Sequence, residues 1–181
     1  MILLTGFDRY GSYKENLSGL IIKNLDIKDL NLKKEVLPVS WKLSLNSYKN
    51  LLNKLGKKPK IVILLGIHSN PHYHLEKIGW NFAFGQDNGN NIKFGLIKNN
   101  FHLWLRTPLN LRELYPLLKN TINIRISYFA GTYLCNYIYY WALLLSCNKY
   151  PTLFIHIPDN EKLSRGINFV NKIIRTIIQI L

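Results

Sequence analysis

Strand-like and helix-like segments alternate along almost the whole chain, and this alternation restricts the possible folds more than any other feature. Short apolar runs such as residues 61–65 give way to longer segments with helical spacing of apolar residues, such as residues 162–181. This order is typical of α/β folds, in which helices cover a central sheet. The chain has 181 residues, enough for a sizeable core. We therefore expect one domain over residues 1–181, without a linker or an internal repeat.

The same pattern predicts where the individual elements lie. Strands are expected at residues 2–5, 34–39, 61–65, 101–105, 122–127 and 153–157. Helices are expected at residues 17–25, 43–55, 111–120, 133–146 and 162–181. Residues 86–91 are polar and contain Gly89, which indicates a mobile loop over a functional site.

One cysteine lies where a strand pattern changes into a helix pattern. Cys135 follows the small residues Ala130, Gly131 and Thr132 and enters an almost entirely apolar segment, which predicts a buried helix with Thr132 as its N-cap. In the first turn of a helix, free N–H groups and the helix dipole favour a thiolate and can hold an oxyanion. The position therefore suggests a nucleophile, and the alternative is a buried, unreactive cysteine.

A cysteine nucleophile needs a base and a group that orients the base. His156 lies near the end of the expected strand 153–157, where catalytic groups collect in α/β folds. Glu76 is the candidate for the third group. Taken alone, His156 fits a structural histidine of the core better than a catalytic base, and Glu76 is as consistent with a surface ion pair to Lys77.

Five segments carry a resemblance to one known family. They are Thr5-Gly6-Phe7 with Asn16-Leu17-Ser18, then Leu37-Pro38-Val39-Ser40, Glu76-Lys77-Ile78-Gly79-Trp80-Asn81, Ala130-Gly131-Thr132-Tyr133-Leu134-Cys135-Asn136 and Phe154-Ile155-His156-Ile157-Pro158. In this order they resemble the pyroglutamyl peptidase I family, also called pyrrolidone-carboxylate peptidases. These cysteine peptidases remove an N-terminal pyroglutamate from peptides. The resemblance implies a three-layer α/β/α sandwich around a mixed, twisted sheet.

The resemblance also implies a role for each candidate residue. Cys135 attacks the carbonyl carbon of the pyroglutamyl residue. His156 takes the thiol proton and later protonates the departing amine, and Glu76 holds the imidazole. The implied substrate-binding residues are Phe7, Tyr10, Asn16, Tyr133 and Leu134. Because pyroglutamate is a small uncharged lactam, we expect an apolar, aromatic pocket that would desolvate a charged free N-terminus without compensation.

The chain differs from the family at a position that affects catalysis. The family carries an arginine in the loop after the glutamate motif, and it is thought to assist the oxyanion site. Residues 82–89 contain no arginine, and Phe84 or Gln86 takes that position; elsewhere Phe129 replaces a family serine. Losing such a donor typically costs about 3 kcal/mol. This difference motivates an alternative: a degenerate, non-catalytic relative that binds peptide N-termini.

The chain is strongly basic, with 24 Lys and Arg against 10 Asp and Glu and a formal charge of +14. Such an excess can mark a nucleic-acid or membrane partner, so a basic nucleic-acid-binding module is a second alternative. However, the basic residues are scattered, and their dense cluster at residues 54–60 fits a helix end and the loop after it. We expect peptides with N-terminal pyroglutamate as partners, without nucleic acid or membrane. Homo-oligomers occur in the family.

Three further patterns concern compartment and cofactors. Cys135 and Cys147 are too few for a disulfide framework and lie about 18 Å apart if one helix carries both. The N-terminus lacks a signal-peptide pattern, and the apolar run 138–145 is too short to cross a bilayer, so a cytoplasmic location is expected. His68, His72 and His74 with Glu76 could suggest zinc, but Pro71 favours a loop and the spacing is not helical. We expect no metal and no cofactor.

Overall fold

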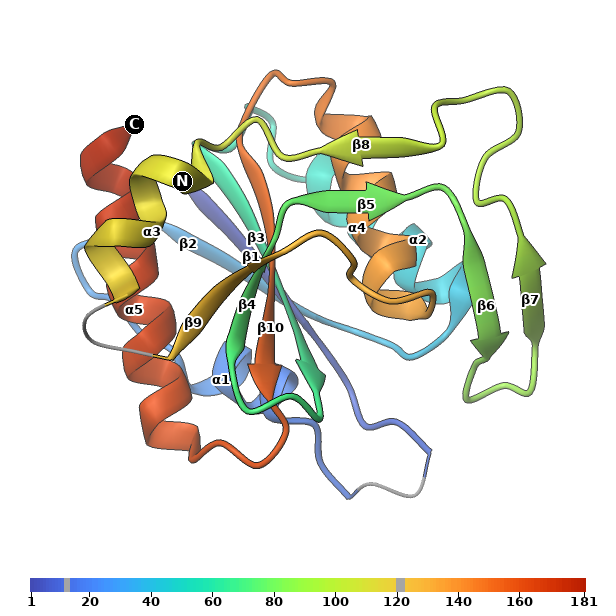
Figure 1. Cartoon of the computed structure of the whole chain (residues 1–181), viewed down its shortest axis with the longest axis horizontal. Helices are drawn as coiled ribbons and strands as arrows, with labels where there is room; N and C mark the ends of the chain where they lie inside the picture. Colours follow the sequence, from blue (N-terminus) through green and yellow to red (C-terminus); the bar gives the residue numbers. More distant parts are fainter. Residues whose placement is uncertain (12–13, 120–122) are drawn as a thin grey trace.

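A six-stranded mixed sheet forms the centre of the molecule (Figure 1). The computed structural model describes residues 1–11, 14–119 and 123–181. The strands lie in the order β2 (Leu32–Leu37), β1 (Ile2–Phe7), β3 (Ile61–His68), β10 (Thr152–Pro158), β4 (Tyr73–Glu76) and β9 (Ile124–Ser127). All neighbouring strands are parallel except β10 and β4, which are antiparallel. The last two strands therefore run opposite to the other four.

Helices cover both faces of this sheet (Figure 1). One face packs against α1 (Leu17–Asn24), α3 (Leu111–Lys119) and α5 (Leu163–Ile180), and the other against α2 (Trp41–Asn53) and α4 (Leu134–Ser146). This arrangement is the three-layer α/β/α sandwich that the sequence predicted. None of the described helices combines the length and apolar character that a membrane crossing requires.

The central strands are apolar without interruption because both of their faces are buried. In β3, Ile61, Ile63 and Leu65 point into one core, whereas Val62 and Leu64 point into the other. Successive side chains of a strand face opposite sides, so a strand between two helix layers needs apolar residues at every position. The sequence patterns were clearest for these strands.

The expected elements agree with most of the structure, with shifts at their ends. Helix α2 begins at Trp41, two residues before the prediction, because Ser40 caps it through a hydrogen bond from the Leu43 N–H at 3.4 Å. Strand β2 ends at Leu37 instead of reaching Val39. Asn120 and Ile122, which the predictions assigned to a helix and a strand, lie outside the described residues.

Four strands were not predicted: β4, β5 (Ile78–Trp80), β6 (Ala83–Gln86) and β7 (Ile92–Gly95). The expected strand at residues 101–105 was wrong in extent and place, because β8 (Trp104–Arg106) pairs with β5 outside the central sheet. The strands β6 and β7 form a separate antiparallel pair. These segments are three or four residues long and most of them are partly exposed, so no run of apolar residues marks them in the sequence.

The polar residues 87–91 connect β6 to β7. The buried carboxylate of Asp87 accepts hydrogen bonds from the N–H groups of Trp41, Gly89 and Asn91 at 2.9 to 3.0 Å. These bonds lower the pKa of Asp87, although its burial acts in the opposite direction. The turn is therefore tied to the start of α2, which argues against the mobile loop that the sequence predicted.

Candidate active site

Cys135 is the second residue of α4, so its thiol lies in the first turn of that helix as the sequence predicted. The predicted N-cap was wrong: Tyr133 is the capping residue, and the carbonyl of Thr132 accepts a hydrogen bond from the Phe84 N–H at 2.7 Å. Within the described residues, the Tyr133 side chain makes no capping bond to the helix. The N–H groups of the first turn therefore lack a side-chain cap beside the thiol.

Gly66 on β3 allows the thiol to approach the sheet. A Cβ atom at Gly66 would lie 2.7 Å from the Sγ atom of Cys135 and 2.8 Å from the Phe154 ring, distances that packed atoms do not adopt. Across the parallel pair of β3 and β10, Gly66 is in register with His156. The register of two central strands therefore brings the thiol and the imidazole together.

His156 and Glu76 form a buried pair. The Nδ1 atom of His156 lies 2.8 Å from the Oε1 atom of Glu76, and the two residues are 6 % and 0 % exposed. Glu76 is the last residue of β4. In the antiparallel pair of β4 and β10, His74 lies directly opposite His156, so Glu76, two residues further along β4, lies diagonally from His156. A carboxylate can only accept, so Nδ1 carries the proton and Nε2 is left for another partner.

The proton affinity of His156 depends on its two partners. Burial by itself lowers the pKa of His156, but the charge of Cys135 and hydrogen bonds to Cys135 and Glu76 outweigh that effect and raise it to about 9. At neutral pH the imidazole is then protonated. A neighbouring imidazolium is the kind of group that activates a cysteine nucleophile in cysteine hydrolases.

Two more histidines, not among the predicted site residues, contact this pair. The ring of His68 stacks on His156 at a centroid distance of 5.0 Å, and His74 meets His68 edge-on at 4.5 Å. The Nδ1 atom of His74 lies 3.9 Å from Glu76 Oε1. Because residues i and i+2 share a strand face, the spacing of His74 and Glu76 could have revealed this contact if β4 had been recognised. The prediction of a loop here was wrong for Tyr73–Glu76.

The electrostatics of these extra histidines differ from those of His156. Burial, followed by the charge of His156, lowers the pKa of His68 to about 4. Burial also lowers the pKa of His74. The Nε2 atom of His68 donates to the carbonyl of His72 at 2.8 Å. Among the described residues, no group of three or more His, Cys, Asp and Glu side chains is arranged to hold a metal ion.

A cluster of aromatic rings surrounds Tyr133, two residues before Cys135 in the chain. Tyr133 contacts Tyr10 and Trp41 with ring centroids 5.2 Å apart in each case, and its hydroxyl donates to the carbonyl of Gln86 at 2.8 Å. Gly85 has φ +142°, and a Cβ atom there would lie 2.6 Å from the Tyr133 ring. The predicted residues Tyr10 and Tyr133 are therefore neighbours, and Trp41 joins them although the sequence analysis missed it.

The other predicted pocket residues lie deeper. Phe7, at the end of β1, and Leu134 are buried in the core under α4. Asn16 caps α1: its Oδ1 atom accepts from the N–H and hydroxyl of Ser18 at 3.0 and 2.8 Å. Its Nδ2 atom donates to the carbonyl of Asp8 at 3.2 Å, which holds the start of the segment that carries Tyr10.

Two buried hydrogen-bonding residues of α4 were missed by sequence reasoning. Asn136 exchanges hydrogen bonds with the backbone N–H and carbonyl of Trp80 at 2.8 Å and donates to the Phe82 carbonyl at 2.9 Å. The hydroxyl of Tyr139 donates to the Glu76 carbonyl at 2.7 Å. These hydrogen bonds connect α4, the helix that carries Cys135, to β4 and to the segment from β5 to Phe82.

The segment without arginine lies in the β6–β7 hairpin. Phe84 is exposed and packs edge-on against Phe94, and the side-chain amide of Gln86 donates to Asn90. Neither position supplies a cation. Cys135 and Cys147 are both free thiols.

A sequence model of the pyroglutamyl peptidase family matches residues 1–164. The pyrrolidone-carboxylate peptidase of Thermococcus litoralis is 34 % identical to this chain over 170 residues, which cover 87 % of this chain and 76 % of the relative. That of Saccharolobus islandicus is 31 % identical over 175 residues, which cover 92 % of this chain and 83 % of the relative. The structure of the Thermococcus litoralis enzyme superposes with a TM-score of 0.88 at 27 % identity, covering 98 % of this chain and 93 % of the other. That of Fervidobacterium islandicum gives 0.83 at 26 % identity, covering 98 % and 95 %. The chain belongs to the pyroglutamyl peptidase family.

Proposed function

We propose that this protein is a cysteine exopeptidase that removes N-terminal pyroglutamate from peptides, with Cys135, His156 and Glu76 as its catalytic residues. The observation that carries the proposal is the arrangement of these three side chains on α4, β10 and β4. Glu76 holds the imidazole at 2.8 Å, and the neighbouring Cys135 raises the pKa of His156. Relatives that match most of the chain carry the name pyrrolidone-carboxylate peptidase.

In the first step, the Cys135 thiolate attacks the carbonyl carbon of the pyroglutamyl residue. A C–S bond forms, and the π electrons of the carbonyl move onto its oxygen. The uncapped N–H groups at the start of α4 are the donors nearest to the sulfur along the chain, and they would stabilise that negative charge. When the C–N bond breaks, His156 gives its proton to the departing nitrogen, which leaves a thioester and a neutral imidazole.

In the second step, water hydrolyses the thioester. His156 takes a proton from the water while the water oxygen bonds to the carbonyl carbon. The C–S bond then breaks, which releases pyroglutamic acid and restores the thiolate beside a protonated imidazole. Glu76 stabilises the imidazolium and keeps Nδ1 protonated, so that Nε2 does the proton transfer in both steps.

The aromatic cluster of Tyr10, Trp41 and Tyr133 is the proposed pocket for the lactam ring, with Phe7, Leu134 and Asn16 supporting it from behind. Flat, uncharged walls suit a lactam, which carries no charge. A free amino terminus is cationic and would lose its hydration in this pocket, which disfavours ordinary peptides.

The absence of the family's arginine from residues 82–89 lowers the expected rate but leaves the mechanism complete. A missing charged donor typically costs about a hundredfold. Among the described residues, no observation favours the non-catalytic or the nucleic-acid-binding alternative over catalysis. The cytoplasmic location and a homo-oligomer stay predictions.

The decisive experiment measures the release of a fluorogenic amine from a pyroglutamyl amide at neutral pH under reducing conditions. We expect turnover that disappears when the thiols are alkylated beforehand. A Cys147→Ser variant is the matched control, because its exposed thiol lies at the far end of α4 and its loss should leave the rate unchanged. Folded, reduced protein that releases no amine would contradict the proposal.

A further inference from the structure

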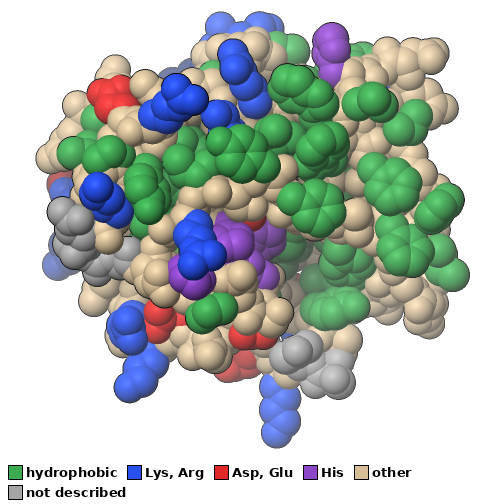
Figure 2. Space-filling view, viewed as in Figure 1, with side chains coloured by type: hydrophobic (Ala, Val, Ile, Leu, Met, Phe, Trp, Pro, Cys, Tyr) green, Lys and Arg blue, Asp and Glu red, His purple; other side chains and the backbone are tan. Residues whose placement is uncertain are grey.

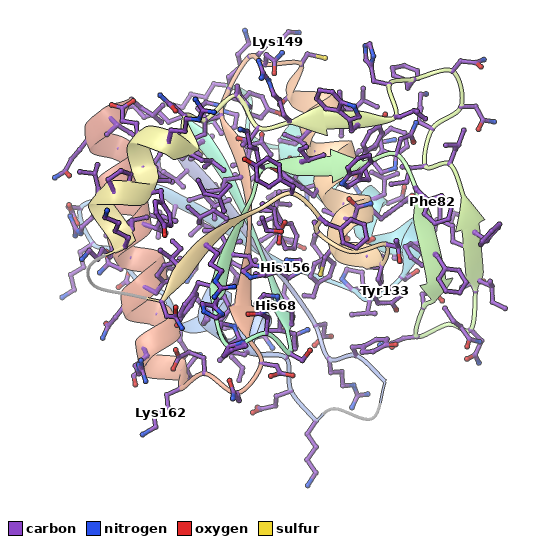
Figure 3. All side chains as sticks on the ribbon, viewed as in Figure 1. His68, Phe82, Tyr133, Lys149, His156 and Lys162 are labelled. Atoms are coloured by element: carbon purple, nitrogen blue, oxygen red, sulfur yellow. The ribbon has the colours of Figure 1, made fainter. Side chains whose placement is uncertain are left out.

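A cavity of about 290 Å³ lies beside His156, and its lining includes Glu76, His68, His74, Phe129 and Gly131. Figure 2 shows a group of histidines at the centre of one face, next to a hollow bordered in part by apolar side chains, and one further histidine apart from them at the upper edge. In Figure 3, His68 and His156 lie together, and Tyr133 lies apart from them toward the β6–β7 hairpin. The cavity around His156 is therefore distinct from the aromatic cluster, because none of Tyr10, Trp41 and Tyr133 is among its lining residues.

The proposed reaction assigns the cavity and the aromatic cluster to different parts of the substrate. The lactam ring lies against Tyr133 and Tyr10. His156 must deliver its proton to the nitrogen of the leaving residue, so that residue has to lie next to the imidazole. The side chain that follows pyroglutamate then points into the cavity that His156 lines.

Phe129 provides an exposed aromatic wall in this cavity. Its side chain is 60 % exposed, although its backbone is held on both sides by one hydroxyl: Ser127 Oγ accepts from the Phe129 N–H at 3.2 Å and donates to the Phe129 carbonyl at 3.3 Å. A ring that is positioned but unburied gains most when another apolar surface covers it.

Besides the charged pair of His156 and Glu76, the cavity lining includes two further imidazoles, those of His68 and His74. Burial keeps the pKa of His68 at about 4 and lowers that of His74, so both imidazoles are neutral at neutral pH. These two rings offer flat surfaces without a charge of their own, and the positive charge of His156 is paired with Glu76. The cavity volume is near the lower limit of about 300 Å³ for pockets that take a whole small molecule, which suits a single side chain.

We infer that this cavity is the subsite for the residue that follows pyroglutamate, and that Phe129 makes it selective for planar aromatic side chains. The inference rests on the proposed function. Aromatic pairs contribute beyond the area that they bury, so we expect an aromatic leaving residue to react about three- to tenfold faster than alanine in terms of kcat/KM.

The test compares kcat/KM for pyroglutamyl-phenylalanine amide and pyroglutamyl-alanine amide. We expect the wild-type protein to prefer phenylalanine, Phe129→Ala to lose that preference and Phe129→Tyr to keep it. Tyr128→Ala is the matched control: Tyr128 is the adjacent residue, is 55 % exposed and contacts Lys77 without lining the cavity. A preference that survives in Phe129→Ala, or that Tyr128→Ala also removes, would overturn the inference.

A second measurement separates this inference from the proposed function. If the wild-type protein cleaves neither amide, the proposed function fails, and the subsite is then tested by calorimetric binding of both amides to Cys135→Ala protein. Tighter binding of the phenylalanine amide than of the alanine amide supports the subsite if the difference disappears in the double variant Cys135→Ala/Phe129→Ala. Equal affinities for the two compounds would contradict it. Far-ultraviolet circular dichroism of each variant verifies that it is folded.

Discussion

The proposed reacting groups and the surfaces around them belong to two regions that differ in burial. Gly66, Glu76 and His156 lie on β3, β4 and β10, which have neighbouring strands on both sides and helices on both faces. In contrast, the β6–β7 hairpin projects from the body of the molecule (Figure 1), and its residues Ile92 and Phe94 are 75 % and 77 % exposed.

This difference in burial separates the strands that carry the proposed reacting groups from a hairpin that only borders the site. Shifting β10 by one residue would turn His156 to the other face of the sheet, away from Glu76. The contact between His156 and Glu76 therefore depends on the exact register of the central strands. The outer region contributes rings and backbone contacts that border the site, such as the bond from Tyr133 to Gln86. We expect substitutions in the core to abolish activity, and those at the exposed hairpin to change little.

The largest expected effect is the loss of turnover in Cys135→Ala and His156→Ala. Each change removes a group that reacts or moves a proton, so we expect kcat/KM to fall by at least about a thousandfold. The measurement is amine release, with thermal unfolding of each variant as the control for folding. Activity that survives in either variant would refute the assignment of these residues.

The next effect is expected at Gly66. A Gly66→Ala methyl group would lie 2.7 Å from Cys135 Sγ, so either the thiol or β3 must move, at a cost of about 1–3 kcal/mol in unfolding free energy. We expect kcat to fall at least about tenfold, because small displacements of reacting atoms slow catalysis strongly.

Gly56→Ala is the control for this change. Gly56 has φ +63° and open space around its Cα, in the loop between α2 and β3. Alanine there costs stability through backbone strain, about 1 kcal/mol, and should leave kcat unchanged. If both variants lost the same activity, contact with the thiol would not be the cause.

The pH dependence follows from the raised pKa of His156, about 9. A group whose pKa is raised on folding stabilises the protein fully below its ordinary value near 6.5, and this contribution is lost as the pH rises through the folded value. The imidazolium that protonates the leaving nitrogen disappears around the folded value. We therefore expect the unfolding temperature to fall between about pH 6.5 and 9, and kcat/KM to fall between about pH 8 and 10. A kcat/KM profile that is flat to pH 10 would contradict the role of the imidazolium.

The smallest effect is expected in the exposed hairpin. Ile92→Ser should change the unfolding free energy by no more than about 0.5 kcal/mol, because its side chain is already in water. Leu64→Ala on β3 should cost about 2–5 kcal/mol, since Leu64 is fully buried. Urea unfolding followed by tryptophan fluorescence measures both. A large loss of stability in Ile92→Ser would show that the hairpin packs against more than the structure describes.

Sequence patterns predicted the elements whose burial leaves a continuous or periodic trace. The central strands β1, β3 and β10 were found because apolar residues fill both of their faces, and α5 because its apolar residues recur on one face. The strands β4 to β7 were missed, since they are short and their partners are distant or exposed. Because β4 was missed, His74 and Glu76 were grouped only as a possible zinc site and were not recognised as neighbours on one strand face.

By itself, the sequence determined the α/β class, the positions of the main helices and strands, and the three residues Glu76, Cys135 and His156 in family-like motifs. Only the tertiary structure decided which strand faces these residues share, how close Gly66 lies to the Cys135 thiol, and which rings gather around Tyr133. The physical reason is that periodicity reflects the burial of one segment, whereas strand order and register depend on pairings between residues far apart in the chain.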